Sequence, residues 1–397
     1  MSVWIVDPID PLVFGDGRPF SAIPGGVLRS RPLPPPTALA GVVRAQLGKS
    51  TGRFDATQIP ALLQISVRGP LVALLNAKGE VDEWLAPRPL DAVVQPKITP
   101  KITTDGVDLC CLRPTAWPAG SLGSQKGSLA PLDCGRSLRK PPRELRPFWR
   151  LKTELIPWLE DPTTLQFSED LGVDGPTPDR RVHVAINPKT GTALHGALFS
   201  VEGRAWIIKH GEGTRRLAFA VDVAGHSAPK ETLHPLGGER RLASWRAHGV
   251  RHQDADWPEL PASLLQAILK KHPPSAVGGA QTRGLRVLLA TPAAFDEGAL
   301  PRDRSFGLRG AKLVAVANDR AEVISGWDLH QGAPKETRRL VPAGAVYYLD
   351  TVDVDDQILT AWLKAKWLCS VSEAPQAQRD GLGLALFGAW DGALQTF

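Results

Sequence analysis

A strand, a helix and a pair of short strands follow one another twice along this 397-residue chain, and this order constrains the fold more than any other feature. In the first copy, alternating apolar residues at 3–7 predict a strand that ends at a turn. A helix is predicted after Pro36, with Thr37 as its N-cap. Two apolar runs at 65–67 and 71–75 follow. The order indicates a mainly antiparallel sheet with a helix on one face.

The second copy occupies the last third of the chain. It contains two predicted helices and three predicted strands, at 258–272, 356–369, 285–290, 313–317 and 345–349. A glycine-rich strand closes the chain. We therefore predict an α+β protein with an N-terminal domain at 1–250 and a C-terminal domain at 251–397.

Residues from about 92 to 180 interrupt the first domain. This segment is rich in Pro, Gly and basic residues and has little periodicity, so we interpret it as a long irregular insertion with partial structure of its own. Between Lys126 and Lys152 it contains eight basic and two acidic residues, a balance of 8 − 2 = +6 that equals the formal charge of the whole chain. With Phe148 and Trp149 inside it, this stretch is typical of a flexible element that follows a phosphate backbone. A solubilising loop is the alternative.

The composition favours a polyanionic partner, because the formal charge is +6 and the pI is about 9.2. No segment approaches the apolar length of a membrane span, and the first residues lack a secretory pattern, so we expect a cytoplasmic protein without membrane contact. The four cysteines have neither zinc-site spacing nor a disulfide framework and are expected to be reduced thiols: Cys110, Cys111, Cys134 and Cys369. No metal or cofactor site is predicted.

Two glycine-containing turns are candidates for phosphate binding. Gly15 and Gly17 flank Asp16 in a tight turn that exposes backbone N–H groups beside Arg18. The alternative is a turn that the Asp16 side chain merely caps. The second turn, at Gly237 and Gly238, precedes Arg240 and Arg241.

Arg240 and Arg241 follow a pair of glycines, which let the backbone approach a ligand closely while the guanidinium groups supply bidentate donors. Equally, Glu239 could satisfy one arginine within the fold. Because consecutive side chains of a strand point to opposite faces, only one arginine need bind a ligand.

A third basic run, from Lys335 to Arg339, leads into a strand that carries Tyr347 and Tyr348, the only tyrosines of the chain. A solvated edge strand explains the charges, and an RNA-facing strand with one tyrosine stacked on a base is the functional alternative. The glycine-rich segment 381–392 looks like a dinucleotide fingerprint, but only five residues follow it, so the acidic partner is missing. The nine histidines are scattered without a catalytic motif, and we expect no enzymatic activity.

Together these segments resemble the family of third subunits of the Cmr complex, the type III-B CRISPR effector, within the RAMP superfamily. The match is ordered and runs from end to end, whereas the insertion matches poorly. The matching segments are 10–20, the helix after Pro36, 181–201, 237–241, 326–328, 338–348 and 381–390.

The resemblance implies two ferredoxin-like (RRM-related) domains and a glycine-rich loop near the C-terminus. It also implies a non-catalytic function, in which the protein holds the 5′ handle of the guide RNA (crRNA) and docks a large polymerase/cyclase-like signalling subunit onto repeated backbone subunits. Gly15 and Ala389 stand where the family often has larger or basic residues, which leaves phosphate contacts there to backbone amides and neighbouring arginines.

The expected RNA-binding set follows from these segments and the resemblance. Phosphates are assigned to seven basic residues, namely Arg18, Arg181, Arg240, Arg241, Lys335, Arg338 and Arg339. Tyr347 is expected to stack on a base, and close backbone approach is expected at Gly381, Gly383 and Gly388.

Two other functions stay open. One is a metal-independent endoribonuclease of the same superfamily, with His183, His195 or His210 as general base. The other is a protein-binding scaffold whose basic insertion meets an acidic partner.

Overall fold

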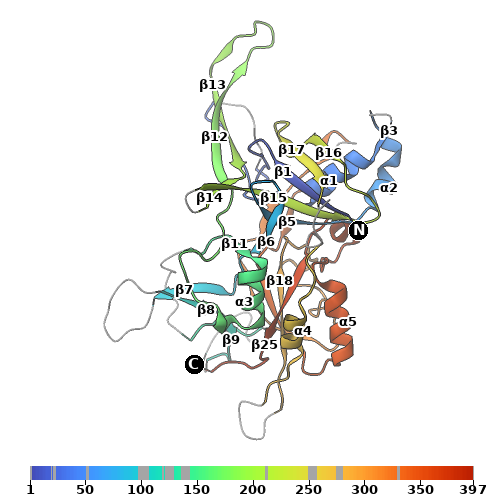
Figure 1. Cartoon of the computed structure of the whole chain (residues 1–397). Coiled ribbons are helices and arrows are strands. Elements are labelled where there is room, and N and C mark those ends of the chain that lie inside the picture. The colour runs from blue at the N-terminus through green and yellow to red at the C-terminus, as the bar shows by residue number, and fades with distance from the viewer. Residues whose placement is uncertain are drawn as a thin grey trace.

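The chain is a mixed α/β protein with several sheets, as the computed structural model shows. Two large sheets form two lobes, with β1 and β15 in the N-terminal one and β18 and β25 in the other (Figure 1). The structure describes residues 2–18, 20, 24–50, 53–96, 107–118, 120, 129–135, 144–210, 213–248, 257–273, 280–328 and 331–396.

The N-terminal sheet has the strand order β11-β6-β5-β15-β1-β17-β16, with β14 paired to β15. Its four central strands β5, β15, β1 and β17 are each antiparallel to their neighbours. The strands are β1 (Ser2–Pro8), β5 (Val67–Leu75), β6 (Val81–Pro87), β11 (Phe148–Arg150), β14 (Ile207–His210), β15 (Gly213–Val223), β16 (Glu231–Pro235) and β17 (Leu242–Ala247).

Helix α1 (Pro36–Leu47) covers one face of this sheet, where its Leu39 and Val43 pack in one cluster with Trp4 and Val6 of β1. The predicted N-cap at Thr37 is wrong, because the helix begins at Pro36. Proline suits the first turn of a helix, where its missing N–H would have no partner anyway.

The C-terminal sheet has the order β19-β24-β18-β25, and all its neighbours are antiparallel. When these four strands are numbered in the order in which they occur along the chain, their order across the sheet is 2-3-1-4. The four central strands of the N-terminal sheet, β5-β15-β1-β17, have the same 2-3-1-4 order. The elements are α4 (Ala262–Leu269), β18 (Gly284–Leu289), β19 (Lys312–Ala317), β24 (Val346–Asp350), α5 (Asp356–Lys366), α6 (Pro375–Arg379) and β25 (Ala385–Trp390).

The described part of the insertion is ordered and joins the two sheets. It contains β7 (Ala92–Pro96), β8 (Val107–Cys111), β9 (Arg113–Pro114), β10 (Leu132–Asp133), the π-helical turn η2 (Leu151–Leu155), α3 (Ile156–Glu160) and the turn η3 (Pro162–Thr164). Trp149 and Trp158 are fully buried, and their rings meet edge to face at 5.4 Å. Both belong to a hydrophobic cluster that includes β18, β24 and β25.

The predicted phosphate-following stretch is wrong over residues 144–152. Phe148 and Trp149 are buried, and Arg150 pairs with Glu83 at 3.0 Å and with Glu154 at 2.6 Å, so this part is core rather than a flexible loop. The remaining basic residues of that prediction lie outside the described residues, namely Lys126, Arg136, Arg139, Lys140 and Arg143.

Buried polar contacts also join the C-terminal sheet to α3 and to the segment between β6 and β7. Arg286 of β18 pairs with Asp91 at 3.1 Å, and Trp158 and Tyr348 donate to the same carboxylate at 3.0 and 2.9 Å. The predicted domain boundary at 250/251 lies outside the described residues. No described helix has both the length and the apolar character needed to cross a membrane.

A long hairpin of β12 (Thr177–Ile186) and β13 (Ala193–Ala205) projects from the N-terminal lobe (Figure 1). β2 (Val27–Arg29) pairs with β13 in parallel and completes a three-stranded sheet. The short elements are β3 (Lys49–Ser50), β4 (Arg53–Phe54), η1 (Ala56–Gln58), α2 (Ile59–Leu63), β20 (Glu322–Ile324), β21 (Trp327–Asp328), β22 (Ala333–Pro334) and β23 (Arg338–Leu340).

Candidate nucleic-acid interface

The loop at residues 11–18 follows β1 and is held by backbone pairing on two sides. Leu12 donates to the carbonyl of Arg204 at 2.9 Å and accepts from its N–H at 2.8 Å. Arg31 donates its backbone N–H to the Phe14 carbonyl at 2.7 Å. Leu12, Val13 and Phe14 are buried, so the loop is anchored by its apolar residues, and its tip with Arg18 stays at the surface.

The turn at residues 237–241 packs against this loop. Gly238 donates to the Val13 carbonyl at 2.7 Å, and a Cβ at Gly237 would lie 2.4 Å from that same oxygen. Gly237, Glu239 and Arg240 all have left-handed φ values, of +79°, +58° and +52°. The two non-glycine residues hold a conformation that L-residues rarely adopt, which is a form of strain that clusters at functional sites.

The two-stranded ribbon of β20 and β23 reaches the loop from the C-terminal lobe. The Arg31 guanidinium donates to the Val323 carbonyl at 2.8 Å and pairs with Glu322. A Cβ at Gly17 would lie 3.2 Å from Cγ1 of Val323, so the turn of Gly17 and this ribbon touch. β23 carries Arg338 and Arg339, the last two residues of the basic run, so that the loop, the turn at 237–241 and this ribbon, three segments far apart in the sequence, meet here.

The basic side chains at this meeting point are exposed and, with one exception, have no acidic partner in the described part of the chain. We call Arg18, Arg240, Lys335, Arg338 and Arg339 the arginine clasp; all five are exposed. Arg18 contacts Asp16 at 3.5 Å but keeps 75% of its side chain in solvent. Exposed guanidinium groups without a protein carboxylate are free to bind phosphate oxygens.

Two predicted arginines differ from the clasp. Arg241 is half-buried, and its Nε has no hydrogen-bond partner among the residues that the structure describes. Arg181 lies on β12, 49% exposed, and pairs with Asp179 at 2.9 Å. A phosphate at Arg181 would therefore have to compete with a carboxylate.

The structure corrects the expectations for Tyr347 and the three glycines. Tyr347 is fully buried between Phe295 and Phe306, and its hydroxyl donates to the Ala299 carbonyl at 2.6 Å, so no face of its ring is open to a base. Tyr348 is buried as well.

Gly381, Gly383 and Gly388 are also buried, and the backbone approaches that they allow are to protein. A Cβ at these positions would lie 2.3 Å from the Gly69 carbonyl, 2.5 Å from the Ser372 hydroxyl and 2.8 Å from a Leu159 methyl group, respectively. The glycines are thus required for chain packing and do not line the surface.

Sequence reasoning missed Arg29, Arg31 and Arg320. Arg29 and Arg320 are exposed near the clasp, on β2 and before β20, and Arg31 links the loop to the ribbon. Arg29 and Arg31 flank one serine shortly after the Gly-Asp-Gly turn, which is the only sequence signal for them.

Two of the three candidate histidines lie on the projecting hairpin of β12 and β13. His183 stacks on Phe199 at 5.5 Å, His195 is exposed on the hairpin, and the side chain of His210 lies outside the described residues. No group of His, Cys, Asp and Glu among the described residues could hold a metal ion. Burial, with the nearby Asp91 carboxylate, raises the pKa of the Cys111 thiol to about 12, so this thiol stays protonated.

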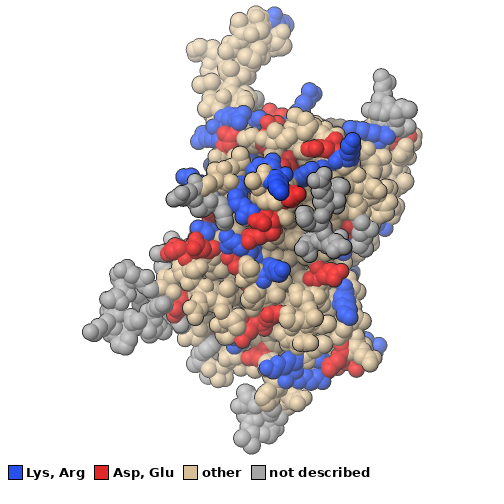
Figure 2. Space-filling view, viewed as in Figure 1, with Lys and Arg blue, Asp and Glu red and all other residues tan. Residues whose placement is uncertain are grey.

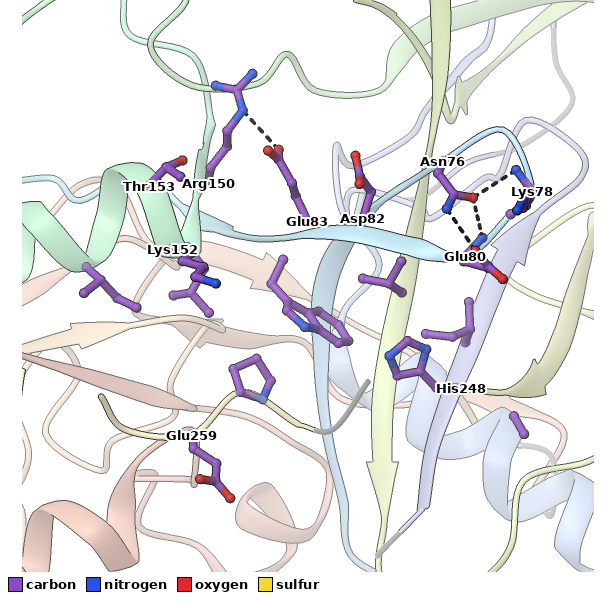
Figure 3. Close-up of a pocket in the computed structure, with 18 of the residues that line it drawn as sticks. Asn76, Lys78, Glu80, Asp82, Glu83, Arg150, Lys152, Thr153, His248 and Glu259 are labelled. Carbon is purple, nitrogen blue, oxygen red and sulfur yellow. Dashed lines mark hydrogen bonds and ion pairs between the residues drawn. The ribbon is translucent and has the colours of Figure 1, made fainter. Parts of the chain in front are cut away.

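A cavity of about 930 Å³ opens on the sheet face opposite α1, beside Trp84 and His248 (Figure 3). Its charges are mixed, and Arg150 is paired with Glu83 at 3.0 Å. On the face shown in Figure 2, basic and acidic side chains are interspersed. This mixture is unlike the clasp, where Asp16 is the one acidic partner among the described residues.

The chain is a CRISPR-associated protein, because the model of one family of such proteins matches residues 4–390. That family is Cas_Cmr3, and since the match covers nearly the whole sequence, the chain belongs to it. The resemblance to the third subunit of the Cmr complex is thereby confirmed.

Two solved structures are similar to the chain at low identity. A chain in the cryo-EM structure of the type III-B Cmr-beta bound to cognate target RNA and AMPPnP is 12% identical, with 91% of this chain and 93% of that chain covered and a TM-score of 0.43. A chain in the cryo-EM structure of the type III-B Cmr-beta bound to cognate target RNA is 16% identical, with 87% and 86% covered and a TM-score of 0.43. No curated protein matches.

Proposed function

We propose that this protein is a non-catalytic RNA-binding subunit of a type III-B CRISPR effector, and that the arginine clasp holds the 5′ handle of the guide RNA. The observation that carries the proposal is the meeting of cations from three distant segments on the loop at 11–18, without acidic partners among the described residues except Asp16. Family membership supports the same assignment. A handle is single-stranded, and its phosphates are the groups that exposed arginines bind most strongly.

We further infer that each lobe is ferredoxin-like. Such a domain follows a β-α-β-β-α-β order, and the common strand order of the two central sheets supports this assignment. Each lobe has a helix in one of the two crossover positions: α1 between β1 and β5, and α5 between β24 and β25. The other crossover of each lobe has no helix in the part of the chain that the structure describes.

Docking between the large subunit and the repeated backbone subunits is part of the same proposal. The projecting hairpin supports it, because its apolar side chains Val182, Ile186 and Leu198 are 66%, 53% and 57% exposed. Apolar residues gathered on an element that leaves the body of a protein are typical of a protein interface.

Charge removal at the clasp tests RNA binding. The Arg240→Ala, Arg338→Ala, Arg339→Ala triple variant should bind a single-stranded handle RNA more weakly, and each lost phosphate contact should lower the salt slope of binding by about 1. Arg309→Ala is the matched control, since Arg309 is equally exposed and lies outside the clasp. An unchanged salt slope of RNA binding in the triple variant would show that the clasp does not bind the handle.

The non-catalytic part of the proposal has a separate test. The full-length protein is incubated with repeat RNA in the presence of a chelator, and intact RNA is expected. Specific cleavage that His183→Ala abolishes would make the protein a metal-independent endoribonuclease instead.

A further inference from the structure

A second cavity, of about 600 Å³, opens where the two lobes meet beside the clasp. We call it the junction cavity. Its floor is formed by Leu71, Leu85 and Phe148 of the N-terminal sheet, all at most 5% exposed, and its sides by Pro34, Pro70 and Pro342. Because proline rings have a fixed backbone φ and no rotatable side chain, these walls are rigid and apolar.

Charged residues at the junction cavity balance one another. Three arginines and three carboxylates line it: Arg18, Arg31, Arg320, Asp16, Asp319 and Glu322. Asp16 contacts Arg18, Glu322 pairs with Arg31, and Asp319 accepts from the Arg320 backbone N–H at 2.7 Å. The formal charges of the lining therefore cancel, and the exposed Arg320 guanidinium is the one of the three without an acidic partner among the described residues.

Arg31 holds one wall of this space in place. It is only 9% exposed, and its terminal nitrogens bond to Val323 and Glu322. Its Nε is buried below the protein surface, without a hydrogen-bond partner among the described residues, and is not open to a ligand. The cavity therefore recognises a ligand mainly through its apolar walls.

The junction cavity and the clasp share residues. Arg18 belongs to both, and Val323 of the cavity wall is directly opposite Arg339 in the ribbon of β20 and β23. Directly opposite residues of an antiparallel pair have their side chains on the same face, with Cβ atoms about 5 Å apart. A strand with phosphates at Arg18 and Arg339 would therefore pass over the mouth of the cavity.

We propose that the junction cavity binds one unstacked nucleobase of the RNA strand whose phosphates the clasp holds; this inference rests on the function proposed above. A base is uncharged, flat and apolar on both faces, and it carries acceptor atoms at its edge. Single-stranded RNA is commonly recognised through bases that are turned out of the stack. The position of the cavity beside free arginines favours a base over an apolar side chain of a protein partner.

An abasic walk tests the proposal with the full-length protein. The probes are a fluorescent decamer with the sequence of the guide RNA 5′ end and ten copies that each lack one base, so that all have the same charge. For the wild type, removal of one particular base should weaken binding about tenfold, the order expected from losing one stacked or buried base. Ala343→Trp, which fills the mouth of the cavity, should weaken binding of the intact decamer about tenfold and abolish the dependence on that base.

Two further variants control this experiment. Ala262→Trp adds the same side chain at an exposed position of α4, away from the cavity, and should behave as the wild type. Val323→Trp adds the same bulk at another lining residue and replaces Ala343→Trp if that variant melts at a much lower temperature.

Three outcomes overturn the inference, and each differs from failure of the proposed function. Wild-type binding that no single abasic position weakens, or a retained dependence in both tryptophan variants, means that no base enters the cavity. If a tryptophan variant no longer binds a neighbouring subunit of the complex but binds RNA as the wild type does, the cavity holds a side chain of a protein partner instead. If instead the clasp triple variant binds the decamer as the wild type does, the proposed function itself fails.

Discussion

Tyr347 and Tyr348 are the only tyrosines of the chain, and they are adjacent residues of β24 that point to opposite faces of the C-terminal sheet. Tyr347 packs with Phe306, whereas the single hydroxyl proton of Tyr348 is shared between the Asp91 carboxylate and the Leu112 carbonyl of the insertion. Burial raises the pKa of both phenols, and for Tyr348 the Asp91 carboxylate raises it further. The two hydroxyls therefore stay protonated in the folded protein well above their ordinary range.

This burial predicts how the stability of the protein depends on alkaline pH. An unfolded chain ionises its tyrosines near pH 10, whereas the folded chain keeps both protons. The unfolded state then binds fewer protons, so the free energy of unfolding should fall as pH rises above about 10 and should show no tyrosine contribution below it. A titration that records tyrosinate absorbance and circular dichroism together should show both signals changing at the same pH. Tyrosinate formation in a protein that is still folded would contradict the burial.

At the scale of elements, the turn at 237–241 shows how backbone geometry places an arginine of the clasp. A Cβ at Gly237 would meet the Val13 carbonyl at 2.4 Å in a left-handed conformation, whereas a Cβ at Gly238 would lie at an ordinary 3.5 Å from that oxygen. The two neighbouring glycines therefore differ sharply in what they tolerate.

Gly237→Ala should destabilise the protein by about 1–2 kcal/mol for the left-handed residue alone. It should also weaken RNA binding, because the turn that presents Arg240 must move away from the loop at 11–18. Gly238→Ala is the matched control and should leave both properties close to the wild type. Thermal melting and RNA titration of the two variants check the prediction, and equal behaviour of the pair would contradict it.

The positions of helices and strands could be predicted where apolar residues are regularly spaced, but the solvent exposure of their side chains could not. The predicted helix at 356–369 corresponds to α5, where the Asp355 carboxylate accepts from the N–H groups of Gln357 and Ile358. By contrast, the sequence of a strand with two adjacent tyrosines suggests that one face of the strand is exposed. Tyr348 is nevertheless buried, because the insertion covers that face. The same packing buries the glycine-rich segment, so its close approaches are to other parts of the chain.

The candidate site was predictable only in pieces. Arginines beside glycine turns gave Arg18 and Arg240, and the basic run at 335–339 gave Arg338 and Arg339. Their meeting at one loop depends on contacts between residues almost 300 positions apart, such as that of Arg31 with Val323. No local pattern encodes such contacts, and the junction cavity depends on them as well.

At the scale of the whole molecule, one hydrophobic cluster spans both lobes, and the N-terminal lobe has a second cluster of its own between its sheet and α1. A single hydrophobic cluster contains Leu71 of the N-terminal sheet, Trp158 of the insertion and Leu285 of the C-terminal sheet. Arg44 of α1 pairs with Asp380 after α6, which adds a second link between the lobes. The N-terminal lobe thus has a core of its own, and the cluster that spans both lobes and the Arg44 ion pair connect it to the C-terminal lobe.

Asp91→Ala tests this shared core, because Asp91 and Arg286 are 0% and 1% exposed and the substitution leaves a buried guanidinium without its carboxylate. Such a loss typically destabilises a protein by about 3–5 kcal/mol. If the lobes unfold together, calorimetry should show one transition for the wild type and one, at lower temperature, for the variant, each with matching calorimetric and van't Hoff enthalpies. Two transitions, of which the substitution shifts only one, would instead mean that each lobe is stable without the other. The clasp and the junction cavity are built across the lobes, so in a single cooperative unit the RNA-binding geometry exists only when both lobes are folded.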